Sequence, residues 1–388
     1  MSTVLRLLFI LAVTAGLVYY IRRRLVVDTG LTGWKKRALT IWIALLPAPL
    51  IILNLINPSG PPKVTGWLAW PTYIGQALIM LMFVALLAVD LGRLATWGVR
   101  KALKSTPLDP SRRQALARIT GAAVSTVVVG HVAYGVSRAL GDADIVDVPV
   151  TLAKLPKQLD GFTIVQLTDV HVGGTIQREF VEELVARTMA LKPDLIALTG
   201  DFVDGSVEEL APHIAPFAKL SAPHGVYFIT GNHEYYSGAD AWIAKWREMG
   251  VRVLRNERVS IERDGAAFDL AGVDDHGGYR YRGHGMDLPK ALEGRDPSRA
   301  LVLLAHQPRQ VHVAAKHGVD LQLSGHTHGG QVWPWHYIVS LQQGGLVAGR
   351  YRIGDTQLYV SRGAGYWGPP VRVGAPPEIT KVRLLASG

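Results

Sequence analysis

Cysteine is absent from all 388 residues. Its absence excludes disulfide bonds, thiolate metal ligands and a cysteine nucleophile, and is compatible with either side of a bacterial membrane. Acidic residues are scarce in the first 150 positions, which carry the whole net charge of +10, whereas residues 151–388 hold equal numbers of acidic and basic side chains. A basic region favours nucleic acid or membrane as a partner, and the apolar runs between these charges favour membrane.

Four apolar stretches in the first 140 residues approach the roughly 20 residues that a helix needs to cross a bilayer. They are residues 4–20, 38–56, 67–89 and 119–139. The second contains prolines, which membrane helices tolerate, and the fourth is rich in small residues that suit helix packing in lipid. The sequence therefore predicts a transmembrane region over 1–140, a linker over 141–156 and a second domain over 157–388.

The basic residues between these stretches predict how the chain is oriented. They are concentrated in the first and third loops, whereas the second loop, residues 57–66, contains only Lys63. By the positive-inside rule, the first and third loops are cytoplasmic and the domain after residue 140 lies outside. We therefore expect a multi-pass protein of the cell membrane with an extracytoplasmic second domain.

Two alternatives concern export. The first stretch resembles a cleaved signal peptide in length, but it has no small-residue cleavage site and further spans follow it. The run Ser111-Arg112-Arg113 resembles a twin-arginine export signal, although arginines also anchor the cytoplasmic end of a membrane helix. Each of these alternatives places the second domain outside the cytoplasm.

In the second domain, polar motifs stand at the ends of apolar strands. We expect strands at 162–167, 194–198 and 226–229 with helical stretches between them, and further strands at 301–305 and 319–323. This alternation predicts a largely parallel sheet covered on both faces, with its ligand site beyond the carboxyl ends of the strands. The polar residues that follow these five strands are Asp169 and His171, Asp201, Asn232 to Glu234, His306, and His326 with His328.

These residue types indicate a class of chemistry. Nitrogen and oxygen donors without sulfur suit Zn, Mn or Fe rather than Ca or Mg. Two such ions about 3.5–4 Å apart can share a carboxylate and a hydroxide, and hold the attacking and leaving oxygens of a displacement at phosphorus. One aspartate must bridge the ions and one protonated group must assist the leaving oxygen. The pattern therefore predicts two-metal hydrolysis of a phosphate ester.

The order of the motifs D-x-H, G-D, G-N-H-[DE], H and G-H-x-H resembles the calcineurin-like metallophosphoesterases over residues 158–382. Gly325–Gln331, Tyr359–Gly363 and Pro376–Ile379 also resemble the membrane-associated bacterial branch similar to the YkuE and YaeI phosphodiesterases. The resemblance implies an αββα sandwich of two mixed sheets, whereas the strand pattern alone predicts one sheet. It does not extend to the four apolar stretches.

The resemblance also implies a role for each matching residue. It implies that His233 contacts the phosphate and assists the leaving group without binding metal. It also implies that Glu234 is a hydrogen-bond acceptor that orients the His233 ring. The implied metal ligands are Asp169, His171 and His328 for one divalent ion, Asn232, His306 and His326 for the other, and Asp201 as the bridge between them.

The leading interpretation is a membrane-anchored, metal-dependent phosphodiesterase that acts on an envelope or lipid-linked ester. The choice of substrate rests on location alone. Two alternatives remain: a phosphomonoesterase that uses the same ligands, and a non-catalytic, metal-stabilised binding or sensor domain. The complete ligand set together with His233 favours catalysis. Nucleic acid is not expected as a partner, because the second domain is neutral, and the sequence does not give the oligomeric state.

Overall fold

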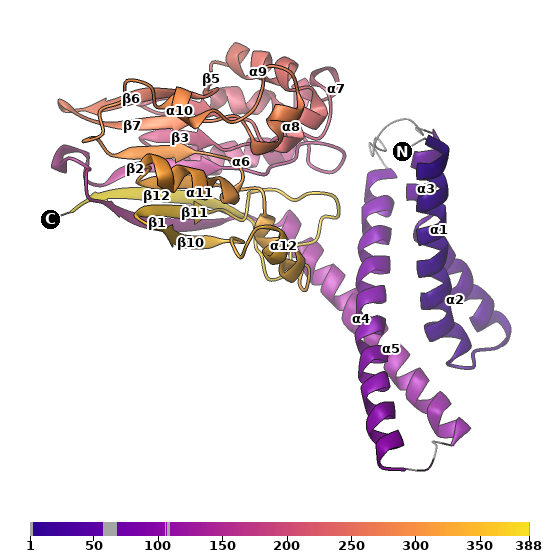
Figure 1. The fold of residues 1–388 in the computed structure, drawn as a ribbon. Coiled ribbons are helices and arrows are strands. Elements are labelled where there is room, and N and C mark those ends of the chain that lie inside the picture. The colour runs from indigo at the N-terminus through magenta and orange to yellow at the C-terminus, as the bar shows by residue number, and fades with distance from the viewer. Residues whose placement is uncertain (1–2, 57–67, 105, 107–108, 388) are drawn as a thin grey trace. The chain divides into compact units, whose positions relative to one another are not determined.

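The structure, a computed structural model, describes residues 3–56, 68–104, 106 and 109–387. The predicted loop 57–66, with Lys63, lies outside the described residues. The chain divides into two compact units, which Figure 1 draws together. The first comprises residues 1–136 and 368–370, and the second comprises residues 137–367 and 371–388.

The described part of the first unit is helical (Figure 1). Three helical runs, Val4–Val27, Ala69–Ala102 and Pro110–Leu140, are long and apolar enough to cross a membrane, and a bent pair of helices passes the same test together. The elements are α1 (Thr3–Arg22), the π-helical turn η1 (Arg23–Val27), α2 (Gly33–Leu45), α3 (Ala48–Ile56), α4 (Ala69–Ala102) and α5 (Pro110–Leu140), of which the last four residues belong to the second unit.

Apolar helices lie at the four predicted places, but their bounds differ from the predicted ones. Two of the differences have a clear physical cause. The second predicted stretch is broken into α2 and α3, which bend by 41°. Pro47 lies in this break, and proline both lacks the N–H of a helical hydrogen bond and clashes with the preceding turn. The third helix continues to Ala102, past the predicted end at residue 89. Hydropathy identifies only the apolar part of a helix, whereas α4 extends through turns that carry Arg93 and Arg100.

The second unit contains two six-stranded sheets (Figure 1). In spatial order, the first sheet consists of β1 (Asp144–Leu152), β12 (Glu378–Ala386), β2 (Phe162–Leu167), β3 (Leu195–Leu198), β4 (Val226–Phe228) and β5 (Arg252–Val253). The second consists of β10 (Gly349–Ile353), β11 (Thr356–Val360), β9 (Leu321–Ser324), β8 (Leu301–Leu304), β7 (Ala266–Gly272) and β6 (Glu257–Arg263). Both sheets are mixed, because β12 and β2, β10 and β11, and β6 and β7 pair antiparallel while the other neighbours pair parallel.

Helices and helical turns connect these strands. Those between β1 and β7 are η3 (Lys157–Leu159), α6 (Arg178–Ala190), α7 (Val207–Ile214), η4 (Ala215–Lys219), α8 (Asn232–Ser237) and α9 (Ala239–Glu248). Those after β7 are η5 (His276–Arg280), α10 (Leu288–Ala291), η6 (Pro308–Gln310), α11 (Val311–Ala314), η7 (Ala315–His317), η8 (His328–Gly330) and α12 (His336–Gln342).

Alternating apolar residues in the strands supply separate cores on the two faces of each sheet. In β2, Phe162 and Ile164 face a core shared by both sheets, while Leu167 belongs to the core beneath α6, α7 and α9. This is the period of two that a strand imposes on its side chains. A third core lies between the second sheet, α10 and α11. The layers therefore form the αββα sandwich that the resemblance implies. The single sheet expected from the strand pattern is wrong, because periodicity does not reveal which strands pair.

The stretch 141–156, assigned to a linker from the sequence, contributes a strand to the first sheet. β1 pairs in parallel with β12 along its whole length, from Asp144 opposite Glu378 to Leu152 opposite Ala386. The strand contains Pro149, and proline is tolerated there because β1 is an edge strand of its sheet.

Candidate metal centre

The polar motifs predicted from the sequence follow the carboxyl ends of five strands, three from one sheet and two from the other. β2, β3 and β4 are parallel neighbours in the first sheet, and β8 and β9 are parallel neighbours in the second. Parallel neighbours present their carboxyl ends at one edge, where ligands bind in open α/β sheets. The two sheets therefore bring their strand-end residues to one place.

Seven acidic and histidine side chains form three overlapping groups at this edge. Within each group, one nitrogen or oxygen atom per residue lies within 4.8 Å of the others. Asp201 and His171 each belong to two groups and so connect all three. The groups are Asp169, His171 and His328; His171, Asp201 and His233; and Asp201, His306 and His326.

Contacts between the two sheets hold these groups together. Nε2 of His171, which follows β2, lies 3.0 Å from Nε2 of His328, which follows β9. Nε2 of His306 lies 3.0 Å from Oδ2 of Asp201. The Asp169 carboxylate accepts hydrogen bonds from the backbone N–H of His326 at 3.0 and 2.9 Å. The site therefore exists only where both sheets are packed together.

Two buried atoms of the predicted ligands have no hydrogen-bond partner among the described residues. They are Oδ1 of Asn232 and Nδ1 of His326. Buried polar atoms are almost always paired, so two unpaired acceptors in one site need an explanation. A metal ion supplies it, because imidazole nitrogen and amide oxygen without sulfur are donors that suit Zn, Mn or Fe. The donor set thus fits a metal centre.

The backbone at these residues adopts a conformation that side chains normally avoid. Of ten non-glycine residues with positive φ in the described chain, five belong to the predicted ligand set, with φ from 52° to 72°. Such strain costs about 1–3 kcal/mol per residue and is concentrated at functional sites. The fold therefore gives up stability to direct these side chains. The five are Asp169, His171, Asp201, His326 and His328.

Gly200 allows the ends of β3 and β4 to meet. Its φ of +89° favours glycine, and a Cβ atom there would lie 2.5 Å from the backbone nitrogen of Gly231 and 2.8 Å from Nδ1 of His306. Backbone atoms cannot move aside as a flexible side chain can. The glycines of the G-D and G-N-H-E motifs therefore permit the approach of Asp201 to the neighbouring strand end.

Asp204 was not predicted from the sequence, yet it contacts two of the site histidines. Its Oδ1 accepts a hydrogen bond from Nδ1 of His233 at 2.6 Å and from Nδ1 of His171 at 3.1 Å. A proton held on Nδ1 leaves Nε2 free to face the site. The available signal was a second carboxylate three residues after Asp201, but turn residues of this kind usually cap or solvate a loop.

Glu234 has a different role from the one inferred for it. Its buried carboxylate accepts hydrogen bonds from the backbone N–H groups of Gly231 at 2.7 Å, Asp201 at 2.9 Å and Phe202 at 2.7 Å. The ring of His233 is held by Asp204 instead. Glu234 thus fixes the backbone around Asp201 rather than the orientation of the histidine.

The comparisons with known proteins agree with this geometry. The profile of the calcineurin-like phosphoesterases matches residues 162–330. An uncharacterized metallophosphoesterase of Helicobacter pylori is 36% identical over 293 residues, which cover 75% of this chain and 77% of that protein. The chain belongs to the calcineurin-like metallophosphoesterases.

Two further relatives extend the similarity beyond the family domain. A bovine transmembrane protein with a metallophosphoesterase domain is 37% identical over 330 residues, covering 81% of this chain and 73% of that protein. The uncharacterized metallophosphoesterase YkuE of Bacillus subtilis is 33% identical over 288 residues, covering 71% and 98%. Membership of the family and the apolar helices of the first unit together describe a metallophosphoesterase with candidate membrane spans.

Neighbouring charges in the metallophosphoesterase site shift the pKa values of His233 and Asp201 in opposite directions. Burial lowers the pKa of His233, but the negative charges of Asp201 and Asp204 outweigh it and raise the pKa to about 9. Burial raises the pKa of Asp201, but the charges of His306 and His233 outweigh that effect and hold it well below its usual range. A protonated imidazole therefore lies beside an ionised carboxylate near neutral pH.

The two histidines after β9 are held neutral. Burial, assisted by the charge of His306, lowers the pKa of His326 to about 3. Burial and the charge of Arg372 lower the pKa of His328 well below its usual range. A neutral imidazole retains the lone pair that a metal ion requires.

Arg372 is a second residue that the sequence did not single out. Its guanidinium is almost completely buried, and burial lowers its pKa to about 10. It donates to Nδ1 of His328 at 3.1 Å and to the backbone carbonyl of the same residue at 2.8 Å. Its remaining hydrogen bonds reach the carbonyls of Arg362, Gly363, Gly365 and Ala375. Arg372 therefore connects the histidine turn to the segment that leads into β12.

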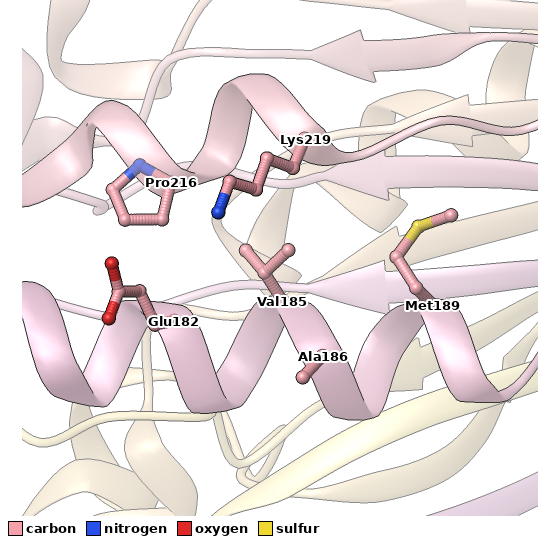
Figure 2. A pocket seen from close by; sticks show the side chains of 6 residues that line it. All are labelled: Glu182, Val185, Ala186, Met189, Pro216 and Lys219. Carbon is pink, nitrogen blue, oxygen red and sulfur yellow. The ribbon is translucent and has the colours of Figure 1, made fainter.

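A surface hollow of about 270 Å³ lies elsewhere in the second unit (Figure 2). It opens between α6 and η4, and none of the residues that line it belongs to the metal centre. Its lining residues are Glu182, Val185, Ala186, Met189, Pro216 and Lys219.

Proposed function

We propose that this chain is a membrane-held, dinuclear-metal-dependent phosphodiesterase. The observation that carries the proposal is the position of Asp201, which groups with His171, a proposed ligand of one ion, and with His306 and His326, proposed ligands of the other. The proposed ligands are Asp169, His171 and His328 for one divalent ion and Asn232, His306 and His326 for the other, with Asp201 between them. Two ions bound there supply Lewis-acid activation of the phosphoryl group and of the attacking water.

The residues of the chain supply the remaining steps. His233, protonated near neutral pH, donates its proton to the leaving alkoxide or aryloxide as the ester bond breaks. Asp204 positions this ring through Nδ1, so the proton to be donated is the one on Nε2. Glu234 holds the backbone at Asp201 and Gly231 in place.

Hydrolysis of simple esters tests the proposal. The full chain in detergent is stripped of metal with a chelator, reloaded with Mn²⁺, and given an aryl phosphodiester or the matching monoester. We expect hydrolysis only after reloading, with the diester cleaved faster. Faster cleavage of the monoester favours a phosphomonoesterase, while two bound metal ions with neither ester cleaved favours a binding or sensor domain.

The Asp204→Asn variant tests the role of the positioning carboxylate. With metal at saturation we expect kcat to fall about 10–100-fold and KM to change little, because Asn retains the shape but loses one of the two carboxylate charges that raise the pKa of His233. Steady-state kinetics alongside metal content by mass spectrometry makes the measurement. Asp264→Asn, in the exposed turn between β6 and β7, is the control. An unchanged kcat for Asp204→Asn contradicts the assignment.

We further propose that the second unit lies outside the cytoplasm, supported by the basic first and third loops. The chain contains no cysteine, so single cysteines report position cleanly. We expect a membrane-impermeant maleimide to label Glu293→Cys in intact cells and Lys36→Cys only after permeabilisation. The reverse pattern places the second unit in the cytoplasm.

A further inference from the structure

A segment of exposed apolar side chains follows the histidine turn directly. We call residues 333–341 the aromatic segment; it comprises the approach to α12 and most of that helix. α12 buries none of its residues, although it carries tyrosine, isoleucine, valine and leucine. Leu341 is 85% exposed and Tyr337 is 62% exposed, and Trp333, Trp335 and Ile338 are also exposed. Apolar groups gathered in this way on a surface mark an interaction site.

The backbone beneath the aromatic segment is held in place. Val332 forms a parallel bridge with Val373, and the N–H of Trp333 donates to the carbonyl of Val373 at 3.0 Å. At the other end, the N–H of Gln343 donates to the carbonyl of Val339 at 2.9 Å. The exposed side chains are therefore presented by a fixed loop and helix.

Residues beside the aromatic segment approach the metal centre. The side-chain amide of Gln331 accepts from the N–H of Trp367 and donates to its carbonyl, each at 2.9 Å. The ring of Trp367, itself exposed, lies 5.8 Å from the ring of His233. The segment thus begins within a few residues of His328 and approaches the site histidine through Trp367.

The charge around the aromatic segment favours a lipid surface. No acidic residue occurs in the sequence between Asp320 and Asp355, and two exposed arginines, Arg350 and Arg352, follow on β10, the outermost strand of the second sheet. Tryptophan and tyrosine concentrate at membrane interfaces, and short apolar helices beside basic residues bind anionic lipid. The same chain carries three helical runs able to span a bilayer.

We infer that the aromatic segment enters the headgroup region of the phospholipid bilayer and brings the metal centre to its surface. Residues 333–341 then bury their side chains about 5–10 Å into the boundary between headgroups and acyl chains. Resting on the proposed function, this placement selects the substrate class: a phosphodiester whose lipid tail remains in the same bilayer. Water attacks the phosphorus, the headgroup leaves with a proton from His233, and a lipid phosphate remains in the membrane.

Spin labels on the full chain in vesicles of phosphatidylglycerol and phosphatidylcholine test the docking. We expect labels at Tyr337→Cys and Leu341→Cys to collide more often with oxygen, which concentrates in lipid, than with a water-soluble nickel chelate. A label at Glu293→Cys, exposed elsewhere on the unit, should show the opposite order. Labels at 337 and 341 that match the one at 293 overturn the inference, as do labels shielded from both reagents, which indicate a protein partner or a second copy.

Hydrolysis distinguishes this inference from the proposed function. The Tyr337→Asp, Leu341→Asp double variant is compared with the unmodified chain on a soluble aryl phosphodiester and on phosphatidyl-p-nitrophenol in vesicles. We expect the double variant to cleave the vesicle-borne ester at least about tenfold more slowly and the soluble ester at an unchanged rate. Equal losses on both esters overturn the inference. If the unmodified chain cleaves neither, the proposed function fails, while the spin-label result still decides the docking.

Discussion

Replacing Asp201 by asparagine is expected to lower kcat/KM on an aryl phosphodiester by at least about a thousandfold, equivalent to about 4 kcal/mol of transition-state stabilisation. Asp201 groups with His171 and also with His306 and His326, and its Oδ2 lies 3.0 Å from Nε2 of His306. Asparagine keeps the shape, and its carbonyl can still accept from the backbone N–H of His233. It removes the negative charge that two neighbouring cations require. We therefore expect the variant to fold and to bind fewer than two metal ions.

A second buried aspartate provides the control for this prediction. Asp269 in β7 is fully buried and pairs with Arg258 at 3.1 Å, away from the ligand groups. Asp269→Asn should lose stability but keep kcat/KM at full metal loading. Mass spectrometry of bound metal, thermal unfolding and initial rates distinguish the two variants. An Asp201→Asn protein within tenfold of the parent rate removes Asp201 from the proposed mechanism.

Replacing Arg372 by methionine is expected to destabilise the second unit by about 3–5 kcal/mol, because several buried carbonyls lose their donor. Methionine fills much of the volume but leaves the carbonyls around the guanidinium without donors, and each unsatisfied buried acceptor costs about 1–3 kcal/mol. For a unit of this size, the melting temperature should fall by roughly 10 °C. Because Arg372 also holds the backbone carbonyl of His328 and so fixes the position of this proposed ligand, metal affinity should fall about 10–100-fold.

An exposed arginine separates the effect of burial from the loss of a charge. Arg383 pairs with Asp147 at the surface, and Arg383→Met should leave the melting temperature almost unchanged. Thermal unfolding and metal titration of both variants make the comparison. Equal melting temperatures for Arg372→Met and Arg383→Met show that the buried contacts of Arg372 contribute nothing measurable to stability.

The local elements of the molecule, its strands and apolar helices, were predictable from the sequence. Each of the five predicted strands that lead to the site is present within one or two residues of its expected bounds. The structure brings together the polar residues that follow those strands. They were predictable because a buried strand and the glycine turn after it form one continuous pattern in the sequence. The apolar helices of the first unit were predictable for a similar reason, since length and hydropathy are properties of a single segment.

The unpredicted part involves residues distant in sequence. Arg372 lies 44 positions from His328, and its guanidinium is identified only by the carbonyls that surround it. From the sequence, Asp204 is an ordinary turn residue. Only the structure shows that its Oδ1 accepts hydrogen bonds from the rings of His171 and His233. Glu234 reads as the neighbour of His233, but its carboxylate points to the backbone of another strand end. In each case the partner, and not the residue itself, decides the role.

The sequence by itself determined the family, the ligand types, the strands that carry them and the apolar segments, because each of these is a pattern of neighbouring residues. Only the tertiary structure decided that twelve strands divide into two sheets, that β1 extends the first of them, and that Nε2 of His171 meets Nε2 of His328. It also decided that no residue of α12 is buried. The physical reason is that burial and pairing depend on which segments meet in space, and periodicity along one segment does not specify the segment that it meets.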